Sequence, residues 1–117
     1  MMVPGSGMRI VVATRPVDFR KQHEGLAAVV SKDLGLDPYS GIVVVFRSRR
    51  ADRVKVLWWD GTGVVLASKR LEQGRFAWPS VNDGVMRLSR GQFEALFEGL
   101  DWRRVWKPRA RRPLSAA

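Results

Sequence analysis

Apolar and polar residues alternate in short blocks through the middle of the chain, between residues 42 and 79. Four apolar runs stand between polar turns, at residues 42–46, 54–59, 64–67 and 76–78. Valine and isoleucine are branched at Cβ, which stiffens the side chain and suits it to a pleated surface. Short runs of this kind between turn residues indicate strands joined by hairpins. The pattern predicts a meander with strands near residues 42–48, 53–59, 63–69 and 75–78.

The second hairpin of this meander has the clearest turn signal. Asp60-Gly61 tolerates the positive backbone angles that a tight two-residue turn requires. Such a turn places Trp59 opposite Thr62, Leu57 opposite Val64 and Lys55 opposite Leu66. Because side chains alternate across a strand, one face of the hairpin carries Val54, Val56, Trp58, Val65 and Ala67, with Lys69 at its end. The other face carries Leu57, Trp59, Val64 and Leu66 near the turn, with Arg53, Lys55, Ser68 and Arg70 at the far end.

Helical patterns flank the meander on both sides. Apolar residues and His23 recur at spacings of three and four over residues 18–33, and Asp18 is the expected N-cap. This places His23 on the packed face of the helix, and Gly25 indicates a close approach to the sheet. A second helix is expected over residues 89–99, where Ser89 and Gln92 have the spacing of a capping box.

These elements predict an α+β fold. A first strand is expected at residues 8–13, and 85–88 is a brief extended segment. The sheet is then mainly antiparallel, of about five strands in a β-hairpin meander, packed with two helices. We expect one α+β domain over residues 1–102, followed by a basic, flexible C-terminal tail over residues 103–117, because that tail combines cations and prolines without an acid.

Composition narrows the classes of partner. The formal net charge is +10, which favours polyanionic partners, chiefly nucleic acid. The chain has no cysteine, which excludes disulfides and thiolate zinc sites. No apolar run reaches the ~18 residues of a membrane span, and the first residues do not have the pattern of a signal peptide. We therefore expect a cytoplasmic protein without membrane contact.

Most of the positive charge gathers in two places, the meander and the tail. Phosphate contacts dominate the affinity of proteins for DNA, and arginine pairs with phosphate through two hydrogen bonds. The predicted DNA-binding residues of the meander are Arg47, Arg49, Arg50, Arg53, Lys55, Lys69, Arg70 and Arg75. Those of the tail are Arg103, Arg104, Lys107, Arg109, Arg111 and Arg112. The alternative is that these charges only keep the protein soluble.

The sequence does not assemble a catalytic site. A two-metal nuclease needs three carboxylates around its metal ions, whereas most of the eleven acids here have ordinary roles in caps, turns and helix surfaces. His23 is the sole histidine, and the chain has no glycine-rich phosphate loop ending in Lys-Ser or Lys-Thr. We expect no catalytic residues, no metal site and no cofactor.

The chain resembles a known family in a series of ordered motifs across residues 3–106. They include Asp18-Phe19-Arg20-Lys21, Asp37-Pro38-Tyr39-Ser40-Gly41, the segment DRVKVLWWDG at 52–61, the segment KRLEQGRFAWP at 69–79, and Glu98-Gly99-Leu100-Asp101-Trp102. These motifs are similar to those of the accessory protein TnpB, the product of the second reading frame of insertion-sequence-66-type transposable elements. His23 departs slightly, since family members often carry phenylalanine there.

The resemblance implies a role in transposition beside a separate transposase. The predicted function is a non-catalytic accessory protein, not an enzyme, that binds DNA at the transposon ends and assists the transposase and other proteins of the same element. The alternative is a protein adaptor for the transposase with little direct DNA binding. The oligomeric state stays open at this point.

Overall fold

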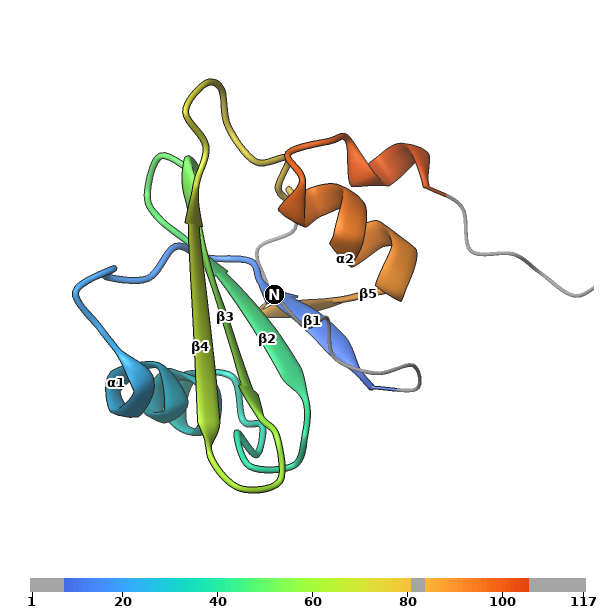
Figure 1. Cartoon of the computed structure of the whole chain (residues 1–117). Helices are drawn as coiled ribbons and strands as arrows, with labels where there is room; N and C mark the ends of the chain where they lie inside the picture. Colours follow the sequence, from blue (N-terminus) through green and yellow to red (C-terminus); the bar gives the residue numbers. More distant parts are fainter. Residues whose placement is uncertain (1–7, 81–83, 106–117) are drawn as a thin grey trace, which may run out of the picture.

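The protein folds around one five-stranded sheet flanked by helices (Figure 1). The computed structural model describes residues 8–80 and 84–105. The strands are β1 (Ile10–Ala13), β2 (Val43–Arg47), β3 (Arg53–Trp59), β4 (Val64–Arg70) and β5 (Val85–Leu88), and their order across the sheet is β4-β3-β2-β1-β5. Strands β1 and β2 are parallel, and every other neighbouring pair is antiparallel. The predicted α+β class with a mainly antiparallel sheet and two helices is confirmed.

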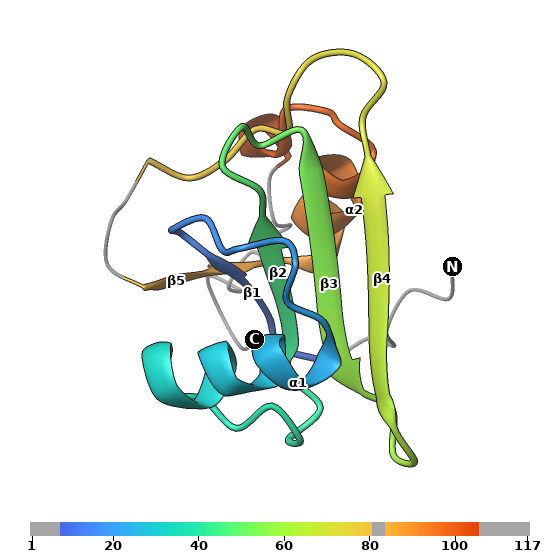
Figure 2. The same cartoon turned by 90° about the vertical axis from the view of Figure 1, so that its left-hand side faces the viewer.

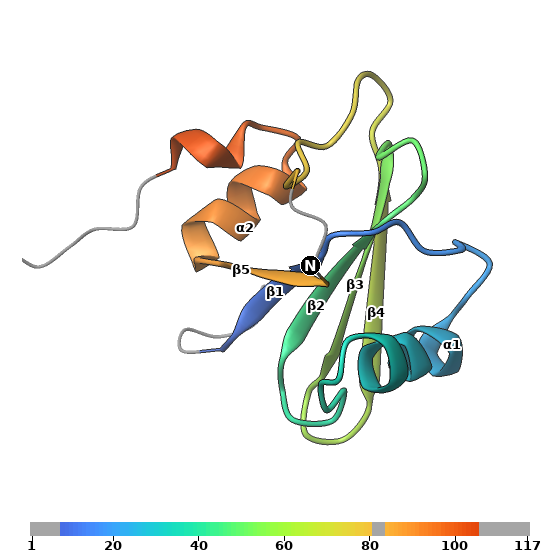
Figure 3. The ribbon, with the colours of Figure 1, turned by 180° about the vertical axis from the view of Figure 1, so that it is seen from behind.

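The helices cover opposite faces of this sheet (Figures 1 and 2). Helix α1 (His23–Ala28) continues into a π-helical turn, η1 (Val29–Asp33), and packs on one face. Helix α2 (Arg90–Phe97) and the short 3-10 helix η2 (Trp102–Arg104) pack on the other, where Figure 3 shows them side by side. The sheet is therefore the middle layer of three.

Two hydrophobic cores follow from the alternation along the strands. In β2, Val43 and Val45 face the α2 side, whereas Val44 and Phe46 face the α1 side. All four are at most 1% exposed, so this central strand is buried on both faces. A continuous apolar run is what a strand with two covered faces requires.

The hairpin between β3 and β4 has a longer turn than the two residues we predicted. The Asp60 amide donates to the carbonyl of Gly63 at 3.0 Å, so residues 60–63 form the turn. Trp59 pairs with Val64 instead of Thr62, and Leu57 pairs with Leu66, a shift of two residues. Because side chains repeat with a period of two, the shift left the predicted faces unchanged.

The fifth strand lies at a different place than predicted. Residues 75–78 form no strand and instead run as an irregular segment packed against the α2-side core. The indole of Trp78 donates to the Ala13 carbonyl at 2.9 Å, and the indole of Trp102 donates to the Ala77 carbonyl at 2.8 Å. Strand β5, at the brief extended segment 85–88, pairs antiparallel with β1 instead. The meander is therefore limited to β2, β3 and β4.

The first helix is shorter than predicted. It begins at His23, and Asp18 is not its N-cap, because the Asp18 carboxylate is bound to the Arg20 guanidinium at 2.7 Å. His23 is exposed instead of packed. A Cβ added at Gly25 would first meet the side chain of Lys21 at 3.1 Å, so the predicted approach of this glycine to the sheet is wrong.

The second helix has the predicted start. The Ser89 hydroxyl accepts from the Gln92 amide at 3.1 Å, and the Gln92 side chain accepts from the Ser89 amide at 2.9 Å. This reciprocal pair is the capping box expected from the sequence. It fixes the end of α2 from which Phe93 and Leu96 enter the core.

Candidate nucleic-acid interface

Two connecting segments meet at one end of the sheet. They are the turn 48–52 between β2 and β3 and the segment that follows β4, and they lie next to each other in Figures 1 and 3. The Leu71 amide donates to the Asp52 carbonyl at 2.9 Å, and the Phe76 amide donates to the Ala51 carbonyl at 2.7 Å. These bonds hold the two segments together, so the side chains that they carry share one surface.

That surface contains a small hollow lined mainly by arginine. Its volume is about 350 Å³, and its lining residues are Ser48, Arg49, Arg50, Asp52, Arg53 and Arg70. We call it the arginine hollow. Arg53 and Arg70 are direct cross-strand partners on β3 and β4, whereas Arg49 and Arg50 come from the turn. The sheet and its turn thus bring four of the predicted DNA-binding residues around one space.

The acid in the hollow does not neutralise these arginines. Asp52 accepts from the Ser48 hydroxyl at 3.0 Å, and the same hydroxyl accepts from the Arg53 amide at 3.1 Å. Within residues 8–80 and 84–105, no ion pair joins Asp52 to an arginine. The Asp52 carboxylate therefore stabilises the turn 48–52 instead of pairing with the guanidinium groups of the hollow.

The arginines on the strands are also weakly compensated. Arg70 and Glu72 are 3.7 Å apart, and their side chains are 66% and 84% exposed. An ion pair this exposed contributes little. Arg53 is positioned by stacking, since its guanidinium carbon lies 5.4 Å from the centre of the Phe19 ring. Like charges directly opposite each other on neighbouring strands repel, and a bound anion would relieve that repulsion.

Lys55 does not belong to this surface. Its side chain is 6% exposed, and its ammonium donates to the carbonyls of Phe19 and Lys21, both at 2.8 Å. Burial lowers the pKa of Lys55, and the charge of Arg53 adds to this effect. Its two hydrogen bonds instead connect the segment before α1 to the sheet.

Lys69 and Arg47 are also held by the fold. The Lys69 ammonium donates to the Phe97 carbonyl at the end of α2, at 2.7 Å, and lies 5.0 Å from the Phe97 ring. Arg47 donates to the Arg49 carbonyl in the neighbouring turn at 3.2 Å. These two cations face the α2 side of the sheet, away from Arg53 and Arg70.

None of the other predicted residues within 8–80 and 84–105 lines the hollow, and four lie outside the described part of the chain. Arg75 is exposed on the segment after β4. Arg103 and Arg104 are exposed on η2, where Asp101 pairs with them at 2.8 and 3.8 Å and the Arg103 contact lowers the pKa of Asp101. Lys107, Arg109, Arg111 and Arg112 lie outside the described residues.

Sequence reasoning missed the residues that organise the hollow. Phe19 orients Arg53, and Ser48 ties Asp52 to the β3 backbone. Ser48 lies between Arg47 and Arg49, and this position beside the basic turn is a usable signal. Phe19 belongs to the motif Asp18-Phe19-Arg20-Lys21, but no local pattern predicts its contact with Arg53, because that contact depends on the path of the segment before α1.

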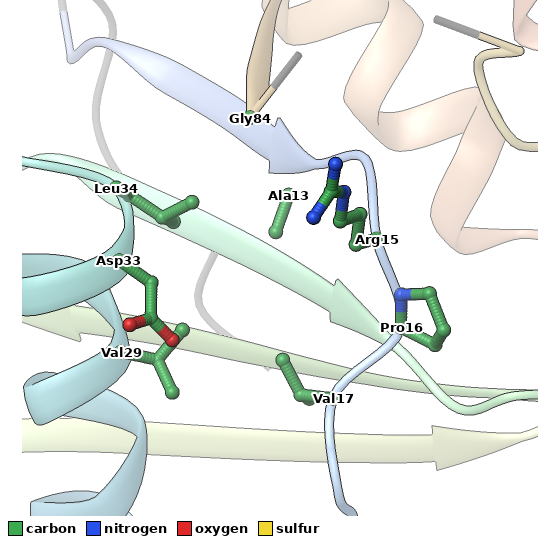
Figure 4. A pocket seen from close by; sticks show the side chains of 8 residues that line it. All are labelled: Ala13, Arg15, Pro16, Val17, Val29, Asp33, Leu34 and Gly84. Carbon is green, nitrogen blue, oxygen red and sulfur yellow. The ribbon is translucent and has the colours of Figure 1, made fainter. Parts of the chain in front are cut away.

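A larger hollow of about 630 Å³ lies between the end of β1 and η1 (Figure 4). Its walls are mostly apolar, including Val17, Val29 and Leu34, and Arg15 and Asp33 enter it from opposite sides. It holds one cation balanced by one acid. It therefore lacks the excess positive charge that distinguishes the arginine hollow.

Residues 8–80 and 84–105 contain neither a metal-binding cluster nor a membrane-spanning helix. No group of three or more histidine, aspartate or glutamate side chains in those residues is arranged to hold a metal ion. No helix in the same residues is long and apolar enough to cross a membrane. Among the described residues, the arginine hollow is therefore the candidate functional site.

Known proteins place the chain in a family. The family described as IS66 Orf2-like protein matches residues 8–107. The chain is 46% identical to uncharacterized protein y4jC of Sinorhizobium fredii, over all of both chains. It is 40% identical to uncharacterized protein y4hO of the same organism, over 92% of this chain and 96% of the relative. No solved structure matches. The resemblance noted in the sequence is thereby confirmed, and the chain belongs to the IS66 Orf2-like family.

Proposed function

We propose that this protein is a non-catalytic accessory factor of DNA transposition that holds the DNA backbone at the arginine hollow and assists a separate transposase. Membership of the IS66 Orf2-like family associates the chain with transposition. The observation that carries the DNA-binding part is the convergence of Arg49, Arg50, Arg53 and Arg70 on one hollow without an ion pair from its acid.

The chemistry of the hollow fits phosphate. A guanidinium group presents a planar set of donors that matches phosphate oxygens, and it stays charged at every physiological pH. Each neutralised phosphate releases counterions and changes the slope of log K against log salt by about −0.9 on duplex DNA. Four such contacts would give a slope near −3.6, which weakens binding about a hundredfold between ~50 and ~200 mM salt.

The other basic residues add to this interface unequally. Arg75 extends it along the segment after β4. Arg103 and Arg104 contribute less per residue, since Asp101 offsets their charge. The other four cations of the tail, Lys107, Arg109, Arg111 and Arg112, supply sequence-independent attraction. Lys55, Lys69 and Arg47 are left out of the proposal, because their cationic groups already bind carbonyls of the chain.

Binding of this kind positions a protein without selecting a sequence. We therefore propose that the transposase and other proteins of the element supply the choice of transposon ends. The competing function is a protein adaptor that binds the transposase and makes little contact with DNA. Under that hypothesis, the positive charge only keeps the protein soluble.

A fluorescence titration separates the two functions. The purified full chain is titrated against a labelled duplex of the element's terminal repeat and against a scrambled duplex of equal length, each at several salt concentrations. We expect similar affinity for both duplexes and a steep loss of affinity with salt. Absence of binding to either duplex at ~50 mM salt, where non-specific contacts are strong, would contradict the proposal. A salt-resistant complex with the transposase in the absence of DNA would then establish the adaptor.

A further inference from the structure

Strand β4 forms an open edge of the sheet (Figure 2). It is seven residues long, and within the described residues β3 is its only neighbouring strand. Four consecutive apolar residues, Val64 to Ala67, are half-buried there instead of fully covered. Strand β5 at the opposite edge is only four residues long.

The hydrogen bonds at the two ends of the hairpin show which backbone groups of β4 face outward. At one end the Asp60 amide donates to the Gly63 carbonyl, and at the other the Leu71 amide donates to the Asp52 carbonyl. The odd-numbered residues from 63 to 71 therefore face β3, since antiparallel ladders alternate. The backbones of Val64, Leu66, Ser68 and Arg70 face outward. No side-chain or loop hydrogen bond within residues 8–80 and 84–105 reaches these four backbones.

The usual protections of an edge strand are missing from β4. Proline, a bulge or an outward lysine normally prevents pairing with another chain. Here the register with β3 runs unbroken from Val64 to Arg70, and the strand contains no proline. Its lysine does not guard the edge, because the Lys69 ammonium is bound to the Phe97 carbonyl on the α2 side.

We propose that two copies of this chain associate along β4, antiparallel and with Ala67 opposite Ala67, to form one continuous sheet. In this register every outward residue of one strand faces an outward residue of the other. Val64 pairs with Arg70 of the second copy, and Leu66 pairs with Ser68. All four outward residues of each strand then find hydrogen-bond partners, and the half-buried apolar residues lie side by side.

Charge complementarity favours a second copy as the occupant of this edge. The register brings Arg70 close to the turn 60–63 of the second copy. The Asp60 carboxylate in that turn accepts from the amides of Thr62 and Gly63, and these bonds lower the pKa of Asp60. Each edge therefore carries a cation at one end and an ionised acid at the other. Two antiparallel copies match these charges twice.

The first test is the mass of the full chain in solution by sedimentation equilibrium at micromolar concentrations. We expect a dimer with twice the 13.2 kDa mass of one chain. A monomer across the whole concentration range would overturn the proposal. This experiment contains no DNA, so its outcome is independent of the proposed function.

A cross-linking experiment tests the register. The chain has no cysteine, so Ala67→Cys introduces a single thiol. Residues opposite each other at a site without ladder hydrogen bonds have Cα atoms about 4.5 Å apart, which falls within the range that a disulfide spans. We expect Ala67→Cys to form a covalent dimer on mild oxidation. The matched control is Arg87→Cys, an exposed position on β5, and equal cross-linking of the two variants would overturn the register.

A proline variant tests the edge itself. The Ser68 amide faces outward, so Ser68→Pro removes a donor needed by the second copy and none that β3 uses. We expect the variant to be monomeric with an unchanged circular dichroism spectrum, whereas Ser68→Ala stays dimeric. A Ser68→Pro variant that remains as dimeric as Ser68→Ala would contradict association along β4.

Discussion

At the scale of single residues, two lysines of neighbouring strands show that a basic residue in the sequence can already be bound within the fold. The ammonium groups of Lys55 and Lys69 both bind carbonyls, on the α1 and α2 sides of the sheet respectively. In both cases the lysine reaches a distant segment and stacks near a phenylalanine ring, Phe19 or Phe97. The two lysines therefore serve the fold, whereas the four arginines of the hollow are positioned to bind a partner.

The first prediction concerns Lys55. Lys55→Met keeps much of the side-chain volume but removes the donor to two carbonyls, Phe19 and Lys21. The two hydrogen bonds lost at this part-buried site contribute about 0.5–1.5 kcal/mol each. We expect the free energy of unfolding to fall by about the sum of these contributions in urea titrations, with DNA affinity unchanged where the variant is folded.

The control for this variant is Lys32→Met at an exposed position of η1, which should leave stability nearly unchanged. A Lys55→Met protein of normal stability that binds DNA more weakly than Lys32→Met would place Lys55 at the interface and contradict its structural role.

At the scale of elements, the capping box of α2 was readable from the sequence, and its energetic role can be measured. Ser89→Ala removes the hydroxyl that accepts from the Gln92 amide. Loss of an N-cap typically costs about 1 kcal/mol. We expect Ser89→Ala to lower the urea midpoint accordingly, whereas Ser31→Ala on η1, whose hydroxyl donates to the Ala28 carbonyl at an exposed site, has a smaller effect. Equal destabilisation by both substitutions would contradict the role of the cap.

The sequence predicted the faces of the β3–β4 hairpin but not its register. The face on which a side chain lies depends only on the alternation along the strand, and a shift of two residues does not change that alternation. The register depends on the turn, where the Asp60 carboxylate accepts from both Thr62 and Gly63 and so stabilises a longer loop. The strand expected at residues 75–78 does not form, because tertiary contacts decide the path of this segment. Its aromatic residues fill the α2-side core, and the indole of Trp78 binds the Ala13 carbonyl.

The candidate site was predicted in part for the same physical reasons. Alternation and charge were sufficient to place Arg53 and Arg70 together on one face, and the structure brings Arg49 and Arg50 to the same hollow. Lys55 shares that face, but the segment before α1 crosses over it, and carbonyls of that segment accept hydrogen bonds from its ammonium. That crossing is a long-range contact, and no local pattern encodes it.

At the scale of the whole molecule, the proposed dimer has a consequence for the proposed DNA interface. Antiparallel pairing along an edge places the two-fold axis perpendicular to the sheet, so both arginine hollows lie on the same side of it. Arg70 is three residues from Ala67, and a rise of about 3.4 Å per residue puts the two Arg70 backbones roughly 20 Å apart. One duplex could then contact Arg49, Arg50 and Arg53 of both hollows and gain affinity through avidity.

A prediction at this scale joins both proposals. Ser68→Pro keeps every basic residue but separates the copies, so we expect it to lower the affinity for a long duplex and to reduce the magnitude of the salt slope towards half. Ser68→Ala is the matched control. An unchanged slope in a variant shown to be monomeric would mean that a single chain makes all the phosphate contacts.

The most direct measurement of the central claim is the salt slope of binding to a scrambled duplex for two double variants. Arg49→Gln with Arg50→Gln removes two cations of the arginine hollow, and Lys32→Gln with Arg87→Gln removes two exposed cations elsewhere. Both pairs lower the net charge equally. If the hollow holds phosphates, the first pair reduces the magnitude of the slope by up to about 1.8 for each hollow that contacts the duplex, and the second leaves it nearly unchanged. Equal, small changes for both pairs would mean that the positive charge acts only through its total, and would contradict a DNA interface at the arginine hollow.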